Sequence, residues 1–378
     1  MSRNSSYGVK RSGCIHKYVW QEAWQSVRPS TVQRSPPLGR RRLLALAPLL
    51  PGLAGCTPRI IPAGLAVGEP SVSAQYFTMA DGARLPFRAW LPQESPRAVL
   101  LGLHGFGDHS RNAFEIPAPL LTAQGLVLYA YDQRGFGAAP HPGIWPGTAT
   151  LVADAVAVTR LVRARHPGVP VFLLGESMGV AVLLVAATAP GSSPGSSPGP
   201  PPADGYILLA PAVRGRASMG GFLRGALEVA VSTIPAVGFR GSAPGYAPTD
   251  SEEAMRRWSQ DPLTTKEFRV DAVHGLVGLM DAAVAAVPHF RAPTLILYGA
   301  KDTIIGQAPM RAALRRFPAD APHRFAYYAE GYHLLLRDRN RALVAADLAA
   351  WVADREAPLP SGADVAGAAW EKASKAGE

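Results

Sequence analysis

The chain is poor in cysteine and in charge. Only two of its 378 residues are cysteines, Cys14 and Cys56, which in practice excludes a disulfide framework and a cysteine-based metal site. Charged residues make up 17% of the chain and apolar residues 48%, and these proportions exclude a disordered chain or a coiled coil. The length is sufficient for one large α/β domain or two smaller domains.

Acidic residues are fewer than basic ones, but the imbalance is local. The formal net charge is +10, and residues 1–42 supply +8 of it through nine Lys or Arg and one acid, Glu22. From Leu43 onward, 29 basic residues stand against 27 acidic ones, a net charge of +2. A folded body with so little excess charge lacks the basic surface that nucleic acids require, so we expect no nucleic-acid partner.

The N-terminal region has the pattern of an export signal. Three arginines at 40–42 are followed by thirteen uncharged residues, 43–55, a run too short for a membrane span, which needs about 20 residues. The run ends in Leu-Ala-Gly-Cys at 53–56, which resembles the lipobox of bacterial lipoproteins. That resemblance implies cleavage before Cys56 and lipidation of its thiol. A twin-arginine signal and a buried apolar segment that ends in cysteine by chance stay open as alternatives.

The lipobox resemblance implies a location in the bacterial cell envelope, with a lipid anchor that holds the protein to a membrane. Thr57 rather than aspartate follows the cysteine, which favours the outer membrane, facing the periplasm, where the envelope has two membranes. Residues 1–39 are long for the basic part of an export signal, so the predicted fold excludes them.

Short apolar runs alternate with helical patterns over most of the chain. Runs rich in Leu, β-branched and aromatic residues predict strands, and apolar residues at helical spacing over 148–165 predict a helix closed by His-Pro-Gly. This alternation predicts an α/β fold with a mostly parallel sheet covered by helices on both faces. The predicted strands are 75–79, 85–91, 98–103, 126–131, 171–174, 206–209, 295–298 and 324–328, and further helices are expected over 178–188 and 341–355.

Composition divides the chain further. Residues 191–203 form a Gly-, Ser- and Pro-rich insertion of low complexity that is unsuited to packing. Residues 211–291 lie between two predicted strands, contain apolar helical patterns over 222–234 and 270–287, and are expected to form a helical cap over the strand ends. The predicted divisions are a leader (1–55), a tether (56–74), the first part of the core (75–210), the cap (211–291), the second part of the core (292–356) and a solvated tail (357–378).

One serine stands at a sharp turn between a predicted strand and a predicted helix. Residues 175–179, Gly-Glu-Ser-Met-Gly, match the pattern G-x-S-x-G, in which the glycines let strand and helix approach while the serine hydroxyl stays clear of the sheet. The pattern also occurs around Ser193 and Ser197, but only Ser177 follows a strand and precedes a helix. Ser177 is therefore the predicted nucleophile.

A serine hydroxyl needs a base within hydrogen-bond reach and an acid that orients the base. In the chain order serine, acid, base, which is typical of α/β hydrolases, Asp302 follows the strand 295–298 and His333 follows the strand 324–328. Two other residues fit less well, because His323 leads into a strand and Asp320 lies in a loop between a helix and a strand.

The transition state of such a reaction places negative charge on the carbonyl oxygen of the substrate, and two backbone N–H groups are expected to stabilise it. Met178, at the N-terminus of a helix, and Phe106, in the glycine-rich loop 104–107, are the predicted donors. For His104, His109 and Asp132 we expect packing or hydrogen bonding within their loops rather than catalysis.

These motifs together resemble the α/β-hydrolase superfamily, and within it the serine hydrolases similar to monoacylglycerol lipases and lysophospholipases. The resemblance implies a triad of Ser177, Asp302 and His333, with Phe106 and Met178 as oxyanion donors. The motifs follow one another in family order over about 235 residues: HGFGDHS (104–110), YDQRGFG (131–137), GESMG (175–179), DPL (261–263), YGAKD (298–302) and GYHLLLRD (331–338).

The predicted function is cleavage of carboxylic esters through an acyl-enzyme on Ser177, with no metal or organic cofactor. Monoacylglycerols, lysophospholipids or similar fatty esters are the expected substrates, because a lipid anchor and an apolar stretch of the cap, 219–223, suit them. Thioesterase, acyltransferase and aminopeptidase activities use the same triad and stay open, with Glu252 or Glu253 as the acid that would bind a free α-amine. A non-catalytic envelope binding protein is the remaining alternative.

Overall fold

The sheet of this protein is built from short apolar strands. The computed structural model describes residues 57–189, 199–240 and 247–376. The chain divides into two units, Met1–Leu50 and Pro51–Glu378, and all described residues lie in the second. The strands of the sheet are Ser71–Val72 (β1), Tyr76–Thr78 (β2), Arg84–Trp90 (β3), Ala98–Leu103 (β4), Leu126–Tyr131 (β5), Val171–Glu176 (β6), Gly205–Leu209 (β7), Thr294–Gly299 (β10) and His323–Tyr328 (β11).

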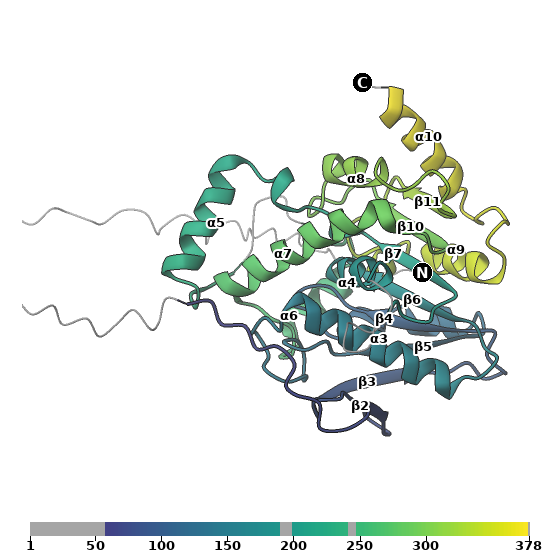
Figure 1. Ribbon diagram of the computed structural model, residues 1–378. Helices are drawn as coiled ribbons and strands as arrows, with labels where there is room; N and C mark the ends of the chain where they lie inside the picture. The colour runs from purple at the N-terminus through teal and green to yellow at the C-terminus, as the bar shows by residue number, and fades with distance from the viewer. Residues whose placement is uncertain (1–56, 190–198, 241–246, 377–378) are drawn as a thin grey trace, which may run out of the picture. The chain divides into compact units, whose positions relative to one another are not determined.

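The order of the strands is β1-β2-β3-β5-β4-β6-β7-β10-β11 (Figure 1). From β5 to β11 the neighbours pair in parallel, and β1, β2 and β3 extend the sheet in antiparallel fashion at the β5 edge. Because the parallel strands share one direction, their carboxyl ends lie along one edge of the sheet. All strands predicted from the sequence are present, each within two residues of its expected ends.

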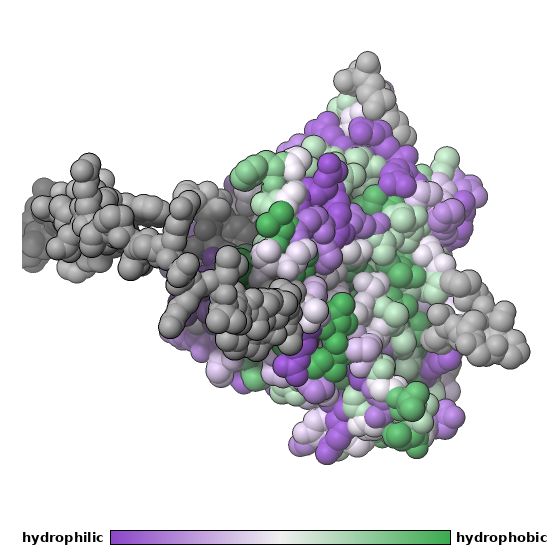
Figure 2. Space-filling model, turned by 60° about the vertical axis from the view of Figure 1, so that its left-hand side comes forward, coloured by the Kyte–Doolittle hydropathy of each residue, from purple (hydrophilic) through white to green (hydrophobic). Residues whose placement is uncertain are grey.

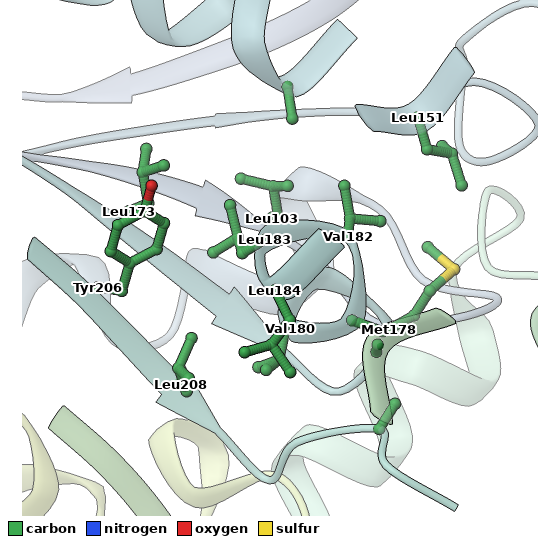
Figure 3. Packing of buried hydrophobic residues seen from close by; sticks show 14 of the residues in the cluster. Leu103, Leu151, Leu173, Met178, Val180, Val182, Leu183, Leu184, Tyr206 and Leu208 are labelled. Carbon is green, nitrogen blue, oxygen red and sulfur yellow. The ribbon is translucent and has the colours of Figure 1, made fainter. Parts of the chain in front are cut away.

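Helices cover both faces of the sheet, as predicted. Side chains of β4 alternate between two buried clusters, with Leu101 and Leu103 in the first and Leu100 in the second. The first cluster includes residues of α3, α4, α7, α8 and α10, and Figure 3 shows its centre around α4; the second includes residues of α1, α2 and α9. These helices are Ser110–Phe114 (α1), Ala118–Thr122 (α2), Thr148–Arg165 (α3), Met178–Ala187 (α4), Val270–Ala286 (α7), Gln307–Leu314 (α8), Arg341–Ala353 (α9) and Ala363–Ala376 (α10).

The segment between β7 and β10, predicted to be a cap, is mainly helical. Its α7 packs against α4 and contributes Leu279 and Ala283 to the first buried cluster, so this helix belongs to the layer over the sheet. Its α5, in contrast, buries only Val231. The elements before α7 are Arg216–Ser218 (η2), Gly221–Thr233 (α5), Gly238–Phe239 (β8), Glu252–Gln260 (α6) and Phe268–Arg269 (β9), and Val287–His289 (η3) follows it.

One helix among the described residues, Val270–His289, is long and apolar enough to cross a membrane by length and composition. Half of its most apolar window is buried inside the protein, and its main part, α7, packs against α4. Core helices of globular domains meet the same length and composition criteria, so this helix is weak evidence for a membrane span.

Residues of the predicted tether (56–74) are hydrogen-bonded to the fold from Arg59 onward. The backbone N–H of Arg59 donates to Asp271 Oδ2 at 3.0 Å, and that of Ile61 donates to the carbonyl of Trp145 at 3.0 Å. Further along, the N–H of Ala63 donates to Thr150 Oγ1 at 3.0 Å. Backbone amides make these contacts, and their partners come from other parts of the chain.

The expectation of a solvated tail after residue 356 is wrong. Helix α10 packs against β11 at the end of the sheet (Figure 1), and Trp370 is only 9% exposed. Its ring stacks on Tyr327 with a centroid distance of 5.5 Å and lies 5.3 Å from the ring of Phe325. Because aromatic rings bury large areas, Trp370 contributes strongly to the packing of this polar, alanine-rich helix on the sheet.

Candidate active site

Ser177 lies at the turn between β6 and α4. Its φ is +52°, a left-handed conformation that L residues seldom adopt outside sites where the surrounding structure enforces it. The turn is so tight that its two flanking glycines could not carry side chains: a Cβ on Gly179 would lie 2.2 Å from the carbonyl oxygen of Leu103, and one on Gly175 would lie 2.7 Å from the backbone nitrogen of Val180. The N–H of Ser177 donates to the carbonyl of Leu209 at 2.9 Å, which ties the turn to β7.

Asp302 and His333 follow neighbouring strands and are in direct contact. His333 Nδ1 lies 2.8 Å from Asp302 Oδ2, and both side chains are buried. The strand ends can meet because neither Gly299 nor Gly331 has a side chain: a Cβ on Gly299 would lie 2.4 Å from the backbone of Gly331. The N–H of Lys301 also donates to the carbonyl of Gly331 at 2.9 Å, which fixes the two loops to each other.

The second oxygen of Asp302 is held by the backbone. Asp302 Oδ1 accepts hydrogen bonds from the N–H groups of Ile304 and Ile305, at 2.8 and 3.0 Å. Burial acts to raise the pKa of Asp302, but the charge and hydrogen bond of His333 and these two N–H groups hold the pKa below its usual value. The carboxylate is therefore ionised at neutral pH, and it orients the imidazole with Nδ1 toward itself and leaves Nε2 for another partner.

Ser177 stands at the same edge of the sheet as this pair. Glu176, the residue before it, forms an ion pair with Arg337, four residues after His333, and Glu176 interacts electrostatically with His333. Among the described residues, no hydrogen bond joins the Ser177 hydroxyl to His333. Hydrogen bonds between catalytic groups are often long in structures without substrate, so this geometry is compatible with a base that engages the serine when substrate is bound.

The glycine-rich loop after β4 lies against the serine turn. A Cβ on Gly105 would lie 3.5 Å from the Cβ of Ser177, so the backbone of this loop passes directly beside the serine. Phe106 follows, with its ring stacked on Phe268 of β9 at a centroid distance of 5.0 Å. Met178, the other predicted donor, is buried at the first position of α4.

His104 and Asp132 hold their loops, as expected from the sequence. Burial lowers the pKa of His104, so its ring is neutral: Nδ1 donates to the carbonyl of Gly105 at 2.8 Å, and Nε2 accepts from the N–H of Gln133 at 3.0 Å. Asp132 Oδ1 accepts from the N–H and hydroxyl of Ser110, at 2.9 and 2.5 Å. These bonds join the loops after β4 and β5.

His109 connects the same region to the predicted cap. Its Nε2 lies 3.1 Å from Asp261 Oδ2 in the Asp-Pro-Leu motif, although without hydrogen-bond geometry. The two residues judged less suitable from the sequence lie away from the serine: His323 Nδ1 is 3.0 Å from the carbonyl of Ala321, and Asp320 is mostly exposed.

Sequence reasoning missed a buried ionic cluster behind the serine. Arg337 lies between Asp108 and Glu176 and is only 2% exposed. The signals available in the sequence were Glu176, inside the motif at 175–179, and Arg337, inside the motif at 331–338, since both are charged residues next to predicted catalytic groups. Cys56, Ser193 and Ser197 lie outside the described residues. Within the described ranges, no group of three or more His, Cys, Asp or Glu side chains could hold a metal ion.

Comparison with known proteins extends these observations. A family model described as serine aminopeptidase, S33, matches residues 94–340. The monoacylglycerol lipase of Mycolicibacterium smegmatis is 24% identical over 283 residues, covering 74% of this chain and 96% of its own length. The monoglyceride lipase of Homo sapiens is 26% identical over 290 residues, covering 74% and 89% respectively.

A solved structure gives the same fold. A soluble variant of monoglyceride lipase from Saccharomyces cerevisiae, in complex with a substrate analogue, has a TM-score of 0.61 with this chain at 20% identity, covering 78% of this chain and 98% of that chain. This likeness confirms the predicted α/β-hydrolase fold.

Proposed function

This chain belongs to the serine aminopeptidase S33 family of serine hydrolases, and on that basis we propose that it cleaves monoacylglycerols or similar fatty esters through an acyl-enzyme on Ser177. The observation that carries the proposal is the contact between Asp302 and His333 at the sheet edge where Ser177 occupies a strained turn. Its relatives over about three quarters of its length are named monoacylglycerol or monoglyceride lipases.

The proposed reaction assigns one role to each group. Ser177 Oγ attacks the ester carbonyl while His333 Nε2 accepts the hydroxyl proton, and Asp302 holds the ring and stabilises its positive charge. The N–H groups of Phe106 and Met178 donate to the oxygen that becomes negative. His333 then gives the proton to the leaving alcohol, and a water activated by the same histidine releases the fatty acid.

The surroundings of the glycine-rich loop support an apolar substrate. Aromatic side chains gather around the proposed oxyanion donor, and they line a small pocket together with two glycines, Ala272 of α7 and the polar residues Thr265, Glu267 and Arg269. The aromatic residues are Phe106, Phe136, Trp145 and Phe268. Such surfaces remove water from acyl chains, which stabilises bound fatty esters by about 25 cal/mol for each Å² buried.

An aminopeptidase is a further candidate because of the family's description. A free α-amine requires an acid inside a pocket, and the sequence offers Glu252 and Glu253 for this role. Glu252 is 95% exposed in its side chain, and Glu253 pairs with Arg257 at 3.2 Å and Arg341 at 3.8 Å. These contacts favour the esterase, and assays on thioesters, aminoacyl amides and added acceptor alcohols distinguish the remaining activities.

Substitution of the serine tests the proposal. Ser177→Ala should abolish hydrolysis of p-nitrophenyl esters and labelling by a fluorophosphonate. The thermal melt should stay nearly unchanged, since among the described residues the Ser177 hydroxyl forms no hydrogen bond that the variant would remove. Ser193→Ala is the matched control, because Ser193 also lies in a G-x-S-x-G pattern, and it should keep full activity. Activity that survives in Ser177→Ala would show that the nucleophile is assigned wrongly.

We also propose that Cys56 carries a lipid that holds the protein to a membrane of the bacterial envelope. In support, Arg59, three residues after Cys56, is linked by hydrogen bonds to a segment with exposed apolar side chains. The N–H of Arg59 donates to the side chain of Asp271, and the N–H of Asp271 donates to the carbonyl of Pro235. Pro235 lies in the sequence between Ile234 and Val237, which are both exposed. On nearby α5, Phe222 is 91% exposed. Figure 2 turns the side that carries α5 toward the viewer, and hydrophobic residues lie among hydrophilic ones on this face.

The anchor is tested with the two cysteines of the chain. Cys56→Ser should keep ester hydrolysis in a detergent extract but move the protein from the membrane to the soluble fraction. Cys14→Ser, the matched control, should stay with the membrane, since cleavage before Cys56 removes residue 14. Unchanged membrane partitioning of Cys56→Ser would refute the lipidation proposal.

A further inference from the structure

A buried cation connects three segments of the proposed active site. The guanidinium of Arg337 donates through one nitrogen to Asp108 Oδ2 at 2.7 Å and through the other to Glu176 Oε1. The first nitrogen also lies 3.4 Å from the carbonyl of Asn112. All three charged side chains are almost fully buried. Water therefore contributes little to their solvation, and the interactions among these groups decide their positions.

Each member of this cluster stands close in sequence to a different proposed catalytic group. Asp108 comes two residues after Phe106, and it also accepts hydrogen bonds from the N–H of His109 at 2.9 Å and from Asn112 Nδ2 at 2.8 Å. Glu176 immediately precedes Ser177. Arg337 comes four residues after His333, at the end of the short 3₁₀ helix Leu335–Arg337 (η4).

The chemistry of the cluster requires arginine. The planar guanidinium presents its nitrogens in a fixed fork, so it can donate to two carboxylates in fixed directions at once. A lysine ammonium is a single point charge on a flexible chain and does not impose these directions. The cluster thus specifies a geometry among three loops in addition to balancing charge.

The charge balance of the cluster depends on Arg337. Burial raises the pKa of Glu176 above its usual value, although the Arg337 charge opposes this rise. Burial also acts to raise the pKa of Asp108, but Arg337 and Asn112 hold it below the usual value. Removal of Arg337 alone would leave two buried carboxyl groups without a cation, which strongly destabilises a folded protein.

We propose that Arg337 is a positioning residue, which sets the loop of Phe106, the turn of Ser177 and the loop of His333 in register for the reaction. This inference rests on the proposed function, since it assigns to Arg337 the alignment of the groups named there. A displacement of about 1 Å in such groups can cost about 100-fold in rate. The alignment acts on the transition state more than on substrate binding, so its loss should lower kcat and leave KM nearly unchanged.

The test is Arg337→Lys, with activity expressed as kcat for each Ser177 that a fluorophosphonate labels at completion. This normalisation counts only folded, reactive enzyme, so a purely structural role of Arg337 would leave the value unchanged. We expect kcat per labelled serine to fall by about 10–100-fold, with KM for a p-nitrophenyl ester within about threefold of wild type. Affinity for a boronic acid that mimics the tetrahedral intermediate should fall in the same proportion as kcat.

Arg134→Lys is the matched control. Arg134 is also buried and also lies between two carboxylates, with Asp81 at 2.6 Å and Asp154 at 2.7 Å, but neither partner neighbours a proposed catalytic residue. This variant should lower the melting temperature to a similar extent, while kcat per labelled serine stays within about threefold of wild type.

A triple variant covers the case in which Arg337→Lys does not fold. Asp108→Asn, Glu176→Gln and Arg337→Gln together remove all three charges and leave no buried ion unpaired. It should fold and show a kcat per labelled serine at least tenfold below wild type. A value equal to wild type in either variant overturns the positioning role. Wild-type enzyme that neither labels at Ser177 nor hydrolyses esters would instead refute the proposed function.

Discussion

The packing of Trp370 allows a test of whether helix α10 is part of the folded core or a solvated tail. The Trp370 ring contacts Tyr327, Phe325 and Tyr298, with centroid distances of 5.5, 5.3 and 6.2 Å. The guanidinium carbon of Arg311 lies 4.5 Å from the same ring. Tyr298 belongs to the strand that leads to Asp302, so α10 covers the sheet behind the proposed acid.

Trp370→Ala removes these contacts and should destabilise the protein by about 3 kcal/mol. Removal of a buried tryptophan or phenylalanine costs about 3–5 kcal/mol. The lower end applies here because Trp370 Nε1 is buried without a hydrogen-bond partner among the described residues, and its removal relieves a cost of about 1 kcal/mol or more. Trp370→Phe keeps a ring and removes the same N–H, so it should lose less than about 1.5 kcal/mol.

Urea unfolding followed by circular dichroism measures these differences. Val365→Ala is the matched control, because Val365 lies on the same helix but is 70% exposed, and its truncation should change the free energy of unfolding by less than about 0.5 kcal/mol. A loss in Trp370→Ala no larger than that in Val365→Ala would refute the inference that α10 is part of the folded core.

Two other predictions concern the serine turn and the loop of His333. Gly179→Ala should destabilise the protein by about 1–3 kcal/mol, because the added Cβ would lie 2.2 Å from the carbonyl oxygen of Leu103. Gly225→Ala is the control: a Cβ at this position of α5 meets open space, so the variant should be more stable by about 0.5–1 kcal/mol. Equal effects of the two substitutions in thermal melts would contradict this reasoning. Burial raises the pKa of Asp338 to about 6. Between the unfolded and folded pKa values the folded state therefore binds more protons than the unfolded state, and the wild-type protein should lose stability as pH rises from about 4 to about 6. Asp338→Asn has no titrating group here, so its free energy of unfolding relative to wild type should rise by up to about 3 kcal/mol between pH 4 and pH 7, as measured by urea unfolding. A difference between the two proteins that does not change with pH would refute the argument.

The parts of the fold that depend on residues close together in the sequence were predictable. Buried parallel strands are continuous apolar runs, and long helices repeat their apolar positions every three or four residues, so both patterns can be read directly from the chain. The turn at Ser177 is local in the same sense, because a strand, two flanking glycines and a helix follow one another without interruption. Asp302 and His333 were predictable one step further, since each follows a strand and parallel strands end at one edge.

Contacts made by backbone groups or between distant residues were not predictable in this way. The docking of the predicted tether depends on the N–H groups of Arg59 and Ile61, and every residue except proline has such a group. Helix α10 was missed because its segment is rich in alanine and charge, and only the aromatic residues on β10 and β11 show why Trp370 is buried.

The sequence by itself determined the main strands, five of the helices, the serine at the bend and the two residues that follow neighbouring strands, because each depends on chemistry within a few adjacent residues. Only the tertiary structure decided that Arg337 would lie between Asp108, 229 positions away, and Glu176, 161 positions away. A charged side chain has the same composition and the same neighbours along the chain whether it faces water or a buried partner. Which of these it meets is set by the distances that folding creates, and in a dry interior those distances determine its energy.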